Sequence, residues 1–315
     1  MNIFAIADLH LSFGENVDKP MDVFGPSWTD YERRLEENWR ALVEPEDLVL
    51  IPGDISWAMH FDDALPDLAW IDSLPGEKLI FKGNHDLWWS SLKKMQGCFE
   101  SITFMQHSAY IGEDFAVCGS RGWILPSDPD FGEADAAIYR RELLRLGMSL
   151  DEARPFIEAA AGCKAPEDPE AGRKALEDPS AGCKAPESAG PGAERRPFLL
   201  IGALHYPPCS IAQKDSDFSS FFESNGFDKV VYGHLHGEAA FAGAFEGIKG
   251  DTEYRLCSLD RLRCVPLLVA KDVRRRGASG PVSGGLPADG DDAPAGGDPA
   301  PCGDAPAYGD DPALG

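Results

Sequence analysis

The chain has 315 residues, of which 43% are hydrophobic, and this length is enough for one large domain or two small ones. Its formal net charge is −24, with 53 acidic against 29 basic residues, which disfavours a nonspecific nucleic-acid binder. No apolar run approaches the roughly 18 residues that a membrane span needs, and the first ten residues lack the basic region of a signal peptide. We therefore expect a cytoplasmic protein with no membrane partner.

Apolar runs and helical patterns alternate along the chain. Five apolar runs predict buried strands, and their ranges are Ile3–Ala7, Leu48–Ile51, Leu79–Phe81, Phe198–Leu204 and Lys229–Tyr232. Residues 247–270 predict further strands joined by short turns. The combination predicts a mixed α/β layered domain, with helices on the outside and the sheet inside.

Two segments between the first strands predict helices. Residues 29–43 carry apolar side chains on one helical face, and Thr29 with Glu32 matches a capping box at the start of that helix. Residues 62–74 also have a helical pattern, but they tolerate Pro66 only if this proline lies in the first turn.

Two low-complexity segments are expected to lie outside the folded domain. The first, residues 159–196, contains a ten-residue repeat in which recurrent Pro and Gly forbid a continuous helix. We interpret it as a disordered insert in a surface loop, in preference to a partner-binding spacer. Residues 277–315 contain 7 Asp and no Lys or Arg, and they predict a disordered acidic tail. A single domain then consists of residues 1–158 and 197–276.

Polar side chains follow every one of the five predicted strands. They are Asp8 and His10, then Gly53 and Asp54, then Asn84, His85 and Asp86, then His205, and finally His234 and His236. Because the carboxyl ends of strands in an open α/β sheet converge on one crevice, we expect these side chains to meet. Oxygen and imidazole donors without a thiolate suit Mn, Fe, Zn, Co or Ni better than calcium.

The number of these donors is too large for one ion and sufficient for two. Two divalent ions about 3.5–4 Å apart, bridged by a carboxylate, are an arrangement that hydrolyses phosphate esters through a metal-bound hydroxide. We therefore expect two divalent transition metal ions, with manganese as the first choice.

The motifs Asp8-x-His10, Gly53-Asp54, Gly83-Asn84-His85-Asp86, His205 and Gly233-His234-x-His236 resemble, in this order, the signature of the calcineurin-like metallophosphoesterases. The resemblance spans the expected domain but not the insert or the tail. It implies a four-layer α/β/β/α sandwich of two sheets flanked by helices, with a dinuclear metal site.

The resemblance also implies a role for each motif residue. Asp8, His10 and His236 would hold one metal, Asn84, His205 and His234 would hold the other, and Asp54 would bridge them. His85 would protonate the leaving oxygen or position the phosphate, and imidazole has a suitable pKa for acid catalysis near neutral pH. His85 and Asp54 are therefore the expected catalytic residues.

Two differences from related families exclude classes of substrate from our expectation. Protein phosphatases of this superfamily follow Gly-Asp with an Asp-Arg-Gly segment, whereas this chain has "GDISWAMHFDD". Bacterial UDP-diacylglucosamine hydrolases typically carry Asn-Arg where this chain has Asn84-His85. A protein-phosphatase activity and a lipid-nucleotide substrate are therefore both disfavoured.

The missing Asp-Arg-Gly segment leaves open which carboxylate orients His85. Asp86, Asp62 and Asp63 are the candidates, and the sequence does not separate them. Asp86 is equally a candidate cap for a helix that starts at Trp88.

Two further features have competing interpretations. Arg121, in the segment "CGSRGW", is a candidate for binding a substrate phosphate, and a structural ion pair is an equal alternative. Trp57, Trp88, Trp89 and Trp123 lie close to motif residues, and we expect them to pack in the core in preference to stacking a substrate ring.

Together these observations predict a dinuclear-metal-dependent phosphoester hydrolase that acts on a small phosphorylated substrate or a phosphodiester. One alternative is a nuclease of the same superfamily, which the acidic insert and tail disfavour. The other is a metal-binding scaffold that has lost catalysis, which the presence of His85 disfavours. The sequence predicts no particular protein partner.

Overall fold

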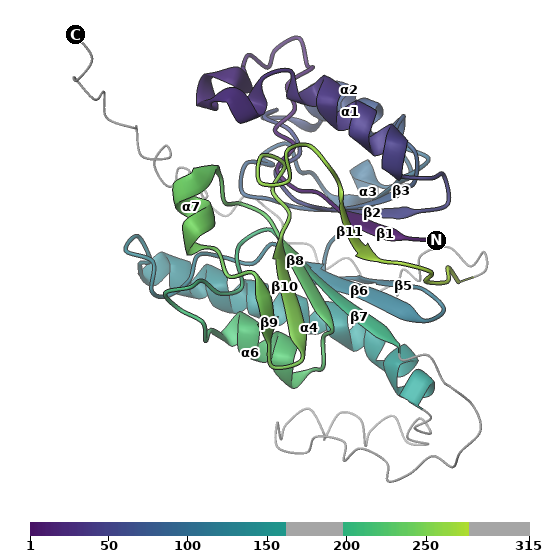
Figure 1. Ribbon diagram of the computed structural model, residues 1–315, viewed down its shortest axis with the longest axis vertical. Coiled ribbons are helices and arrows are strands. Elements are labelled where there is room, and N and C mark those ends of the chain that lie inside the picture. Colours follow the sequence, from purple (N-terminus) through teal and green to yellow (C-terminus); the bar gives the residue numbers. More distant parts are fainter. Residues whose placement is uncertain (162–197, 277–315) are drawn as a thin grey trace.

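The computed structural model describes residues 1–161 and 198–276 (Figure 1). The predicted acidic tail lies outside these residues, and so does the predicted insert except for residues 159–161, which continue a helix. In the described part of the chain, no helix combines the length and the apolar character that crossing a membrane requires.

Two sheets face each other at the centre of the molecule. Their strands are β1 (Ile3–Ala5), β2 (Leu48–Pro52), β3 (Glu77–Phe81), β4 (Ile102–Met105), β5 (Ala109–Ile111), β6 (Phe115–Ser120), β7 (Leu199–Leu204), β8 (Lys229–Tyr232), β9 (Gly247–Lys249), β10 (Thr252–Leu256) and β11 (Leu267–Ala270). The first sheet has the order β11-β1-β2-β3-β4, and the second has the order β5-β6-β7-β8-β10-β9.

The strands that carry the motifs run parallel to their neighbours. β1 to β4 are parallel in the first sheet, and β6, β7, β8 and β10 are parallel in the second. Between the described strands, antiparallel pairing involves only β11, β5 and β9, which lie at sheet edges. The parallel register brings the carboxyl ends of β1, β2 and β3 together, and likewise those of β7 and β8.

Helices cover the outer face of each sheet. The described helices are α1 (Tyr31–Leu42), α2 (Phe61–Asp72), α3 (Leu92–Met95), α4 (Glu133–Ala161), α6 (Asp217–Ser224) and α7 (Gly237–Gly243), with short 3₁₀ turns at Met21–Phe24 and Pro26–Trp28. In Figure 1, α1 and α2 lie above the first sheet, and α4 and α6 lie below the second. This arrangement confirms the predicted four-layer α/β/β/α sandwich.

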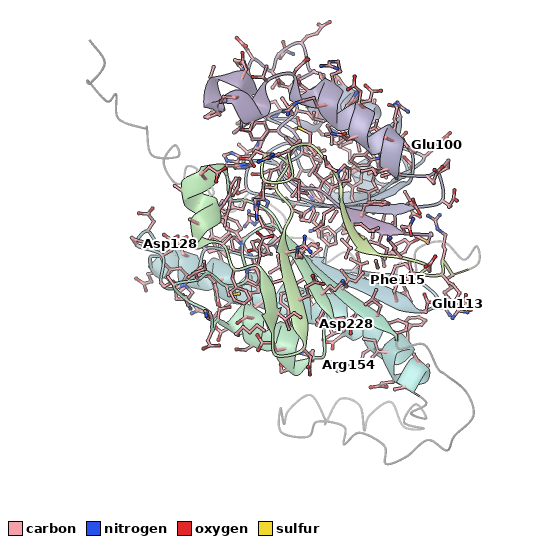
Figure 2. All side chains as sticks on the ribbon, in the orientation of Figure 1. Glu100, Glu113, Phe115, Asp128, Arg154 and Asp228 are labelled. Carbon is pink, nitrogen blue, oxygen red and sulfur yellow. The ribbon has the colours of Figure 1, made fainter. Side chains whose placement is uncertain are left out.

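The apolar strands are buried on both faces. In β1, Ile3 and Ala5 face the second sheet, whereas Phe4 and the following Ile6 belong to the core beneath α1 and α2. The motif strands β2, β3, β7 and β8 follow the same alternation, and side chains fill the space between the layers (Figure 2). Burial on both faces is why the motif strands read as continuous apolar runs in the sequence.

Two of the predicted helix details are wrong. Asp30, not Thr29, precedes α1, and it has a left-handed backbone with no side-chain capping bond. The first residue of α1, Tyr31, anchors the helix instead, because its hydroxyl donates to the carbonyl of His10 at 2.9 Å. Pro66 lies inside α2 beyond its first turn, whereas we expected a helix here only if this proline lay within the first turn.

The connection between β10 and β11 is longer than the short turn we expected. Residues 257–266 leave the second sheet and pass to the first, because β10 and β11 belong to different sheets. The amide of Cys257 donates to Tyr232, and the amide of Leu259 donates to Ala7. This crossing loop therefore contacts the carboxyl ends of β8 and β1.

Candidate metal centre

The motif loops meet where the carboxyl ends of the two sheets come together. Backbone pairing joins two loops of the first sheet, since the amide of Asp8 donates to Gly53 and that of His10 donates to Asp54, both at 3.0 Å. The amide of His234, from the second sheet, donates to the carboxylate of Asp8 at 3.0 Å. The side chains that follow five separate strands therefore lie in one place.

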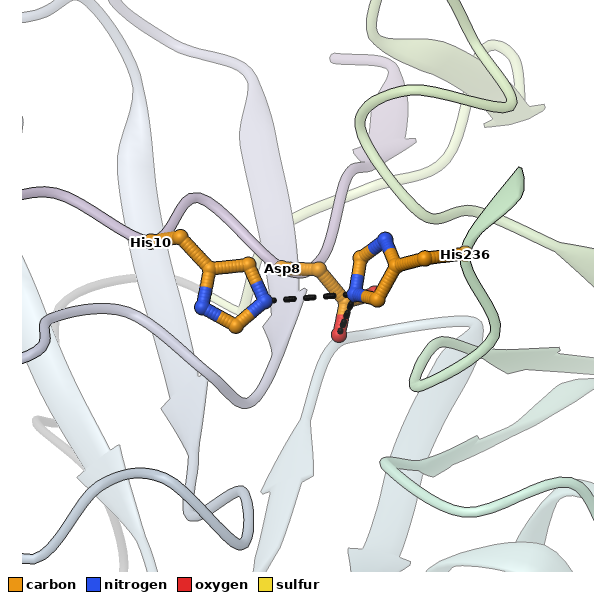
Figure 3. A group of neighbouring side chains, drawn as sticks. All are labelled: Asp8, His10 and His236. Carbon is orange, nitrogen blue, oxygen red and sulfur yellow. Dashed lines mark hydrogen bonds and ion pairs between the residues drawn. The ribbon is translucent and has the colours of Figure 1, made fainter. Parts of the chain in front are cut away.

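Asp8, His10 and His236 form the first group of potential metal ligands, which we call group one. Their ligand atoms lie within 4.8 Å of one another. The Nε2 atoms of His10 and His236 are 3.2 Å apart, and His236 Nε2 is 3.7 Å from Asp8 Oδ1 (Figure 3).

Asp54, His205 and His234 form the second group, which we call group two, and their ligand atoms also lie within 4.8 Å of one another. The amide oxygen of Asn84 points into the same group, 2.6 Å from His205 Nε2 and 3.0 Å from His234 Nδ1.

Asp54 belongs to group two, and its carboxylate also approaches group one. Its Oδ2 atom is 3.4 Å from Nε2 of His205 in group two and 3.9 Å from Nε2 of His10 in group one. Burial, together with the nearby carboxylates of Asp86 and Asp8, raises the pKa of Asp54 well above its ordinary value. A buried carboxylate in this position calls for positive charge close by.

The donors of both groups fit divalent transition metals. Burial lowers the pKa of His10, His205 and His234 well below the usual value, which keeps these rings neutral and able to offer a lone pair. Ring nitrogens point at each other at 3.2 Å in both groups, an arrangement that a shared cation stabilises. Imidazole with carboxylate and amide oxygens is a donor set for such ions.

The backbone at the centre is held in an uncommon conformation. Asp8, His10, Asp54 and His234 all have left-handed φ angles, at 61°, 46°, 54° and 74°. Non-glycine residues in this region cost about 1–3 kcal/mol each, and such strain clusters at functional sites. The surrounding hydrogen bonds and packing stabilise these conformations.

Two glycines allow the loops to approach each other. A Cβ on Gly83 would collide with the carboxylate and the amide of Asp54. A Cβ on Gly53, which has a φ of 90°, would lie 2.6 Å from the Cα of Gly83 and 2.8 Å from Nδ1 of His205. The glycines of the two motifs therefore provide space as well as a turn.

A family model described as calcineurin-like phosphoesterase matches residues 1–238, a range that includes all five motif loops. The chain belongs to the calcineurin-like phosphoesterase family. Family membership and the two ligand groups support a metal-binding phosphoesterase.

Relatives of this phosphoesterase include a viral protein. Gene 66 protein of Mycobacterium phage D29 is 36% identical over 148 residues, which cover 39% of this chain and 72% of the phage protein. Among solved structures, a protein of unknown function, AQ665 from Aquifex aeolicus, has 15% identity and a TM-score of 0.40, covering 84% of this chain and 94% of its own. Phosphopantetheinyl hydrolase PptH from Mycobacterium tuberculosis has 14% identity and a TM-score of 0.41, and the match covers 86% of this chain and 96% of PptH.

Asp86 of the phosphoesterase has a different role from either one predicted. Its Oδ2 accepts the amides of Gly83 and Asp54 at 2.7 and 2.9 Å, and its Oδ1 accepts the amide of Ile55 and the indole N–H of Trp88 at 2.8 and 2.9 Å. No described helix begins at Trp88, since α3 begins at Leu92. The buried carboxylate therefore joins two motif loops.

His85 is half-buried beside group one. Its ring centroid lies 4.6 Å from that of Trp57 and 5.7 Å from that of His10. In the described ranges no carboxylate hydrogen-bonds to this ring; Asp62 pairs with Lys94, and Asp86 binds backbone amides. Burial lowers the pKa of His85, while the charge of Asp8 opposes that shift.

The four tryptophans near the motifs pack against protein groups. Trp88 is 1% exposed and Trp123 is 7% exposed, and Trp89 packs against Phe104. Trp57 stacks on His10 at 4.7 Å, and the ammonium of Lys19 lies 5.3 Å from the centre of its ring. Trp88 and Trp123 therefore pack in the core as expected, whereas for Trp57, which lies half-buried against His10 and His85, packing in preference to stacking a substrate stays a prediction.

Arg121 lies next to group two. Its backbone carbonyl accepts the amide of His205 at 3.1 Å, and its guanidinium lies 4.5 Å from the ring centre of Trp123. The nearest carboxylate contact is long, at 3.9 Å to Glu142, whereas Arg145 approaches that carboxylate at 2.8 Å. Among the described residues, the buried Nε of Arg121 has no hydrogen-bond partner.

The structure adds one residue that the sequence did not single out. Asp260, in the crossing loop, lies 3.0 Å from Nδ1 of His236. Burial tends to lower the pKa of His236, but the carboxylates of Asp260 and Asp8 outweigh it and raise this pKa to about 10. The segment around Asp260 follows no motif pattern, so only the fold reveals this contact.

Proposed function

We propose that this protein is a dinuclear-metal-dependent hydrolase of small phosphate esters, with manganese as its preferred metal. The observation that carries the proposal is the position of Asp54, whose carboxylate lies within 4 Å of a histidine from each ligand group. A shared carboxylate between two groups is the arrangement expected of a pair of bridged ions.

The roles of the remaining ligands follow from their groups. Asp8, His10 and His236 would hold one metal, and Asn84, His205 and His234 would hold the other. When bound, such a pair acidifies water and neutralises the charge of the phosphate oxygens. The neutral state of His10, His205 and His234 supports their assignment, because a ligand nitrogen must offer its lone pair.

His85 is proposed to act on the leaving group. It is next to group one and is not itself among the two groups of ligands, which leaves its ring able to face a substrate oxygen. It either donates a proton to the leaving oxygen or positions the phosphate by a hydrogen bond.

Metal content and substrate choice test the proposed activity. Purified protein is expected to contain close to two transition metal ions per chain and, with manganese added, to hydrolyse p-nitrophenyl phosphate or its bis-aryl diester. Assaying monoester, diester and single-stranded DNA side by side also separates the alternatives. Cleavage of DNA alone would favour a nuclease, and inactivity with every metal would favour a scaffold; either outcome contradicts the proposal.

Arg121 is proposed to bind a phosphate oxygen of the substrate. Arg121→Lys keeps the charge but loses the forked pair of donors, so KM is expected to rise by roughly 10-fold, since hydrogen bonds to charged groups contribute about 1.5–3 kcal/mol. Arg145→Lys is the matched control, because Arg145 pairs more closely with the same Glu142. Equal changes in KM for the two variants would point to the ion pair instead.

A further inference from the structure

Asp260 makes two hydrogen bonds to the end of the last motif loop. Its Oδ1 accepts the Nδ1–H of His236 and its Oδ2 accepts the amide of Gly237, each at 3.0 Å. The side chain of Asp260 is only 3% exposed. Asp260 also lies beyond residues 1–238, the part of the chain that the family model matches.

The loop that carries Asp260 is tied to the strand that leads to Asp8. The amide of Ala7 donates to Cys257 at 2.8 Å, and the amide of Leu259 donates back to Ala7 at 2.9 Å. The amide of Arg261 donates to Oδ1 of Asp260 at 3.0 Å and fixes the direction of its carboxylate. The position of Asp260 relative to Asp8 is therefore set by backbone hydrogen bonds.

These contacts determine which nitrogen of His236 faces group one. A carboxylate only accepts, so the proton on Nδ1 stays between His236 and Asp260. The opposite nitrogen, Nε2, points at Asp8 and His10, at 3.7 and 3.2 Å. Nε2 is therefore the nitrogen that would offer its lone pair to a metal in group one, and the ring already has the orientation that ligation needs.

Among the described residues, neither His205 nor His10 has a carboxylate hydrogen-bonded to its Nδ1 atom. His205 donates its Nδ1–H to the backbone carbonyl of Pro52 at 3.0 Å, which is a neutral acceptor. The Nδ1 atom of His10 is buried without a hydrogen-bond partner in the described residues. An imidazole whose N–H is bonded to a carboxylate is a more basic metal ligand than one bonded to a neutral acceptor. His236 is therefore the histidine of group one whose basicity is raised in this way.

We propose that Asp260 is a positioning residue that holds His236 as an Nε2 ligand and thereby sets the metal affinity of group one. This inference rests on the proposed function, since it assumes that both groups hold metal. It predicts that loss of Asp260 weakens one metal site and leaves the other intact, because in the described part of the chain the carboxylate of Asp260 bonds to His236, Gly237 and Arg261, none of which belongs to group two.

Titration of the metal-free protein with manganese tests this inference. Wild-type protein is expected to bind two ions per chain, and Asp260→Ala to weaken one of them by about 10- to 100-fold while the second keeps its affinity. Asp260→Asn retains an acceptor without the charge, so its loss should be intermediate, and it replaces Asp260→Ala if that variant does not fold. Ser258→Ala, a buried substitution in the same loop, is expected to leave both affinities unchanged.

Two unchanged affinities in Asp260→Ala would overturn the inference, and so would equal weakening of both sites. A wild-type protein that binds no ion contradicts the proposed function, and crystal structures of the metal-free proteins then decide the role of Asp260. A His236 ring that is displaced in Asp260→Ala supports positioning by Asp260. A ring with the same orientation in both structures refutes it.

Discussion

Replacing His85 with alanine is expected to slow the hydrolysis of alkyl phosphate esters by about 10²–10⁴-fold, and that of p-nitrophenyl esters much less. An alkoxide leaves poorly unless it receives a proton, whereas nitrophenolate leaves without one. Metal content is expected to stay near that of the wild type, because His85 belongs to neither ligand group. Steady-state kinetics on both ester classes, with metal analysis of each preparation, measure this difference.

The same experiment separates the two roles considered for His85. If His85 only positions the phosphate, both ester classes lose the same factor, because positioning does not depend on the leaving group. His60→Ala is the control, since His60 is an exposed histidine outside both groups. Asp54→Asn is expected to differ from His85→Ala by losing metal content as well as turnover, because the Asp54 carboxylate lies close to a histidine of each group.

Asp86→Asn is expected to destabilise the fold and to empty the metal centre. The two carboxylate oxygens accept four N–H groups at 2.7 to 2.9 Å. Whichever way the asparagine amide is turned, its nitrogen faces two of these donors. Two unsatisfied buried donors cost about 2–6 kcal/mol in total, at about 1–3 kcal/mol each. Denaturant unfolding measures the loss of stability, and metal analysis measures the loss of ions.

Asp47→Asn controls for the general effect of altering a buried carboxylate. Asp47 also accepts backbone amides, from Asn2 at 2.6 Å and Glu44 at 3.0 Å, but it precedes β2 at the opposite end from the centre. It is expected to lower stability without lowering the number of ions per folded chain. If Asp86→Asn binds two ions with wild-type affinity, Asp86 does not organise the metal centre.

The strands were predictable because their signal is local. All five predicted motif strands are present, and β8 has the predicted bounds. Burial on both faces makes each strand a continuous apolar run, which the sequence displays directly. The start of α1 was not predictable from Thr29 and Glu32, since a tertiary hydrogen bond from Tyr31 to His10 outweighs the local capping preference.

The sequence by itself determined which side chains follow the motif strands, and parallel pairing then required those side chains to converge. It did not determine what holds them in place. The carboxylate of Asp86 reaches the amide of Asp54 across 32 residues, and that of Asp260 reaches His236 across 24. Neither contact has a local pattern, because each forms only after two loops from different strands have been brought together. Only the tertiary structure therefore decides which carboxylates support the centre.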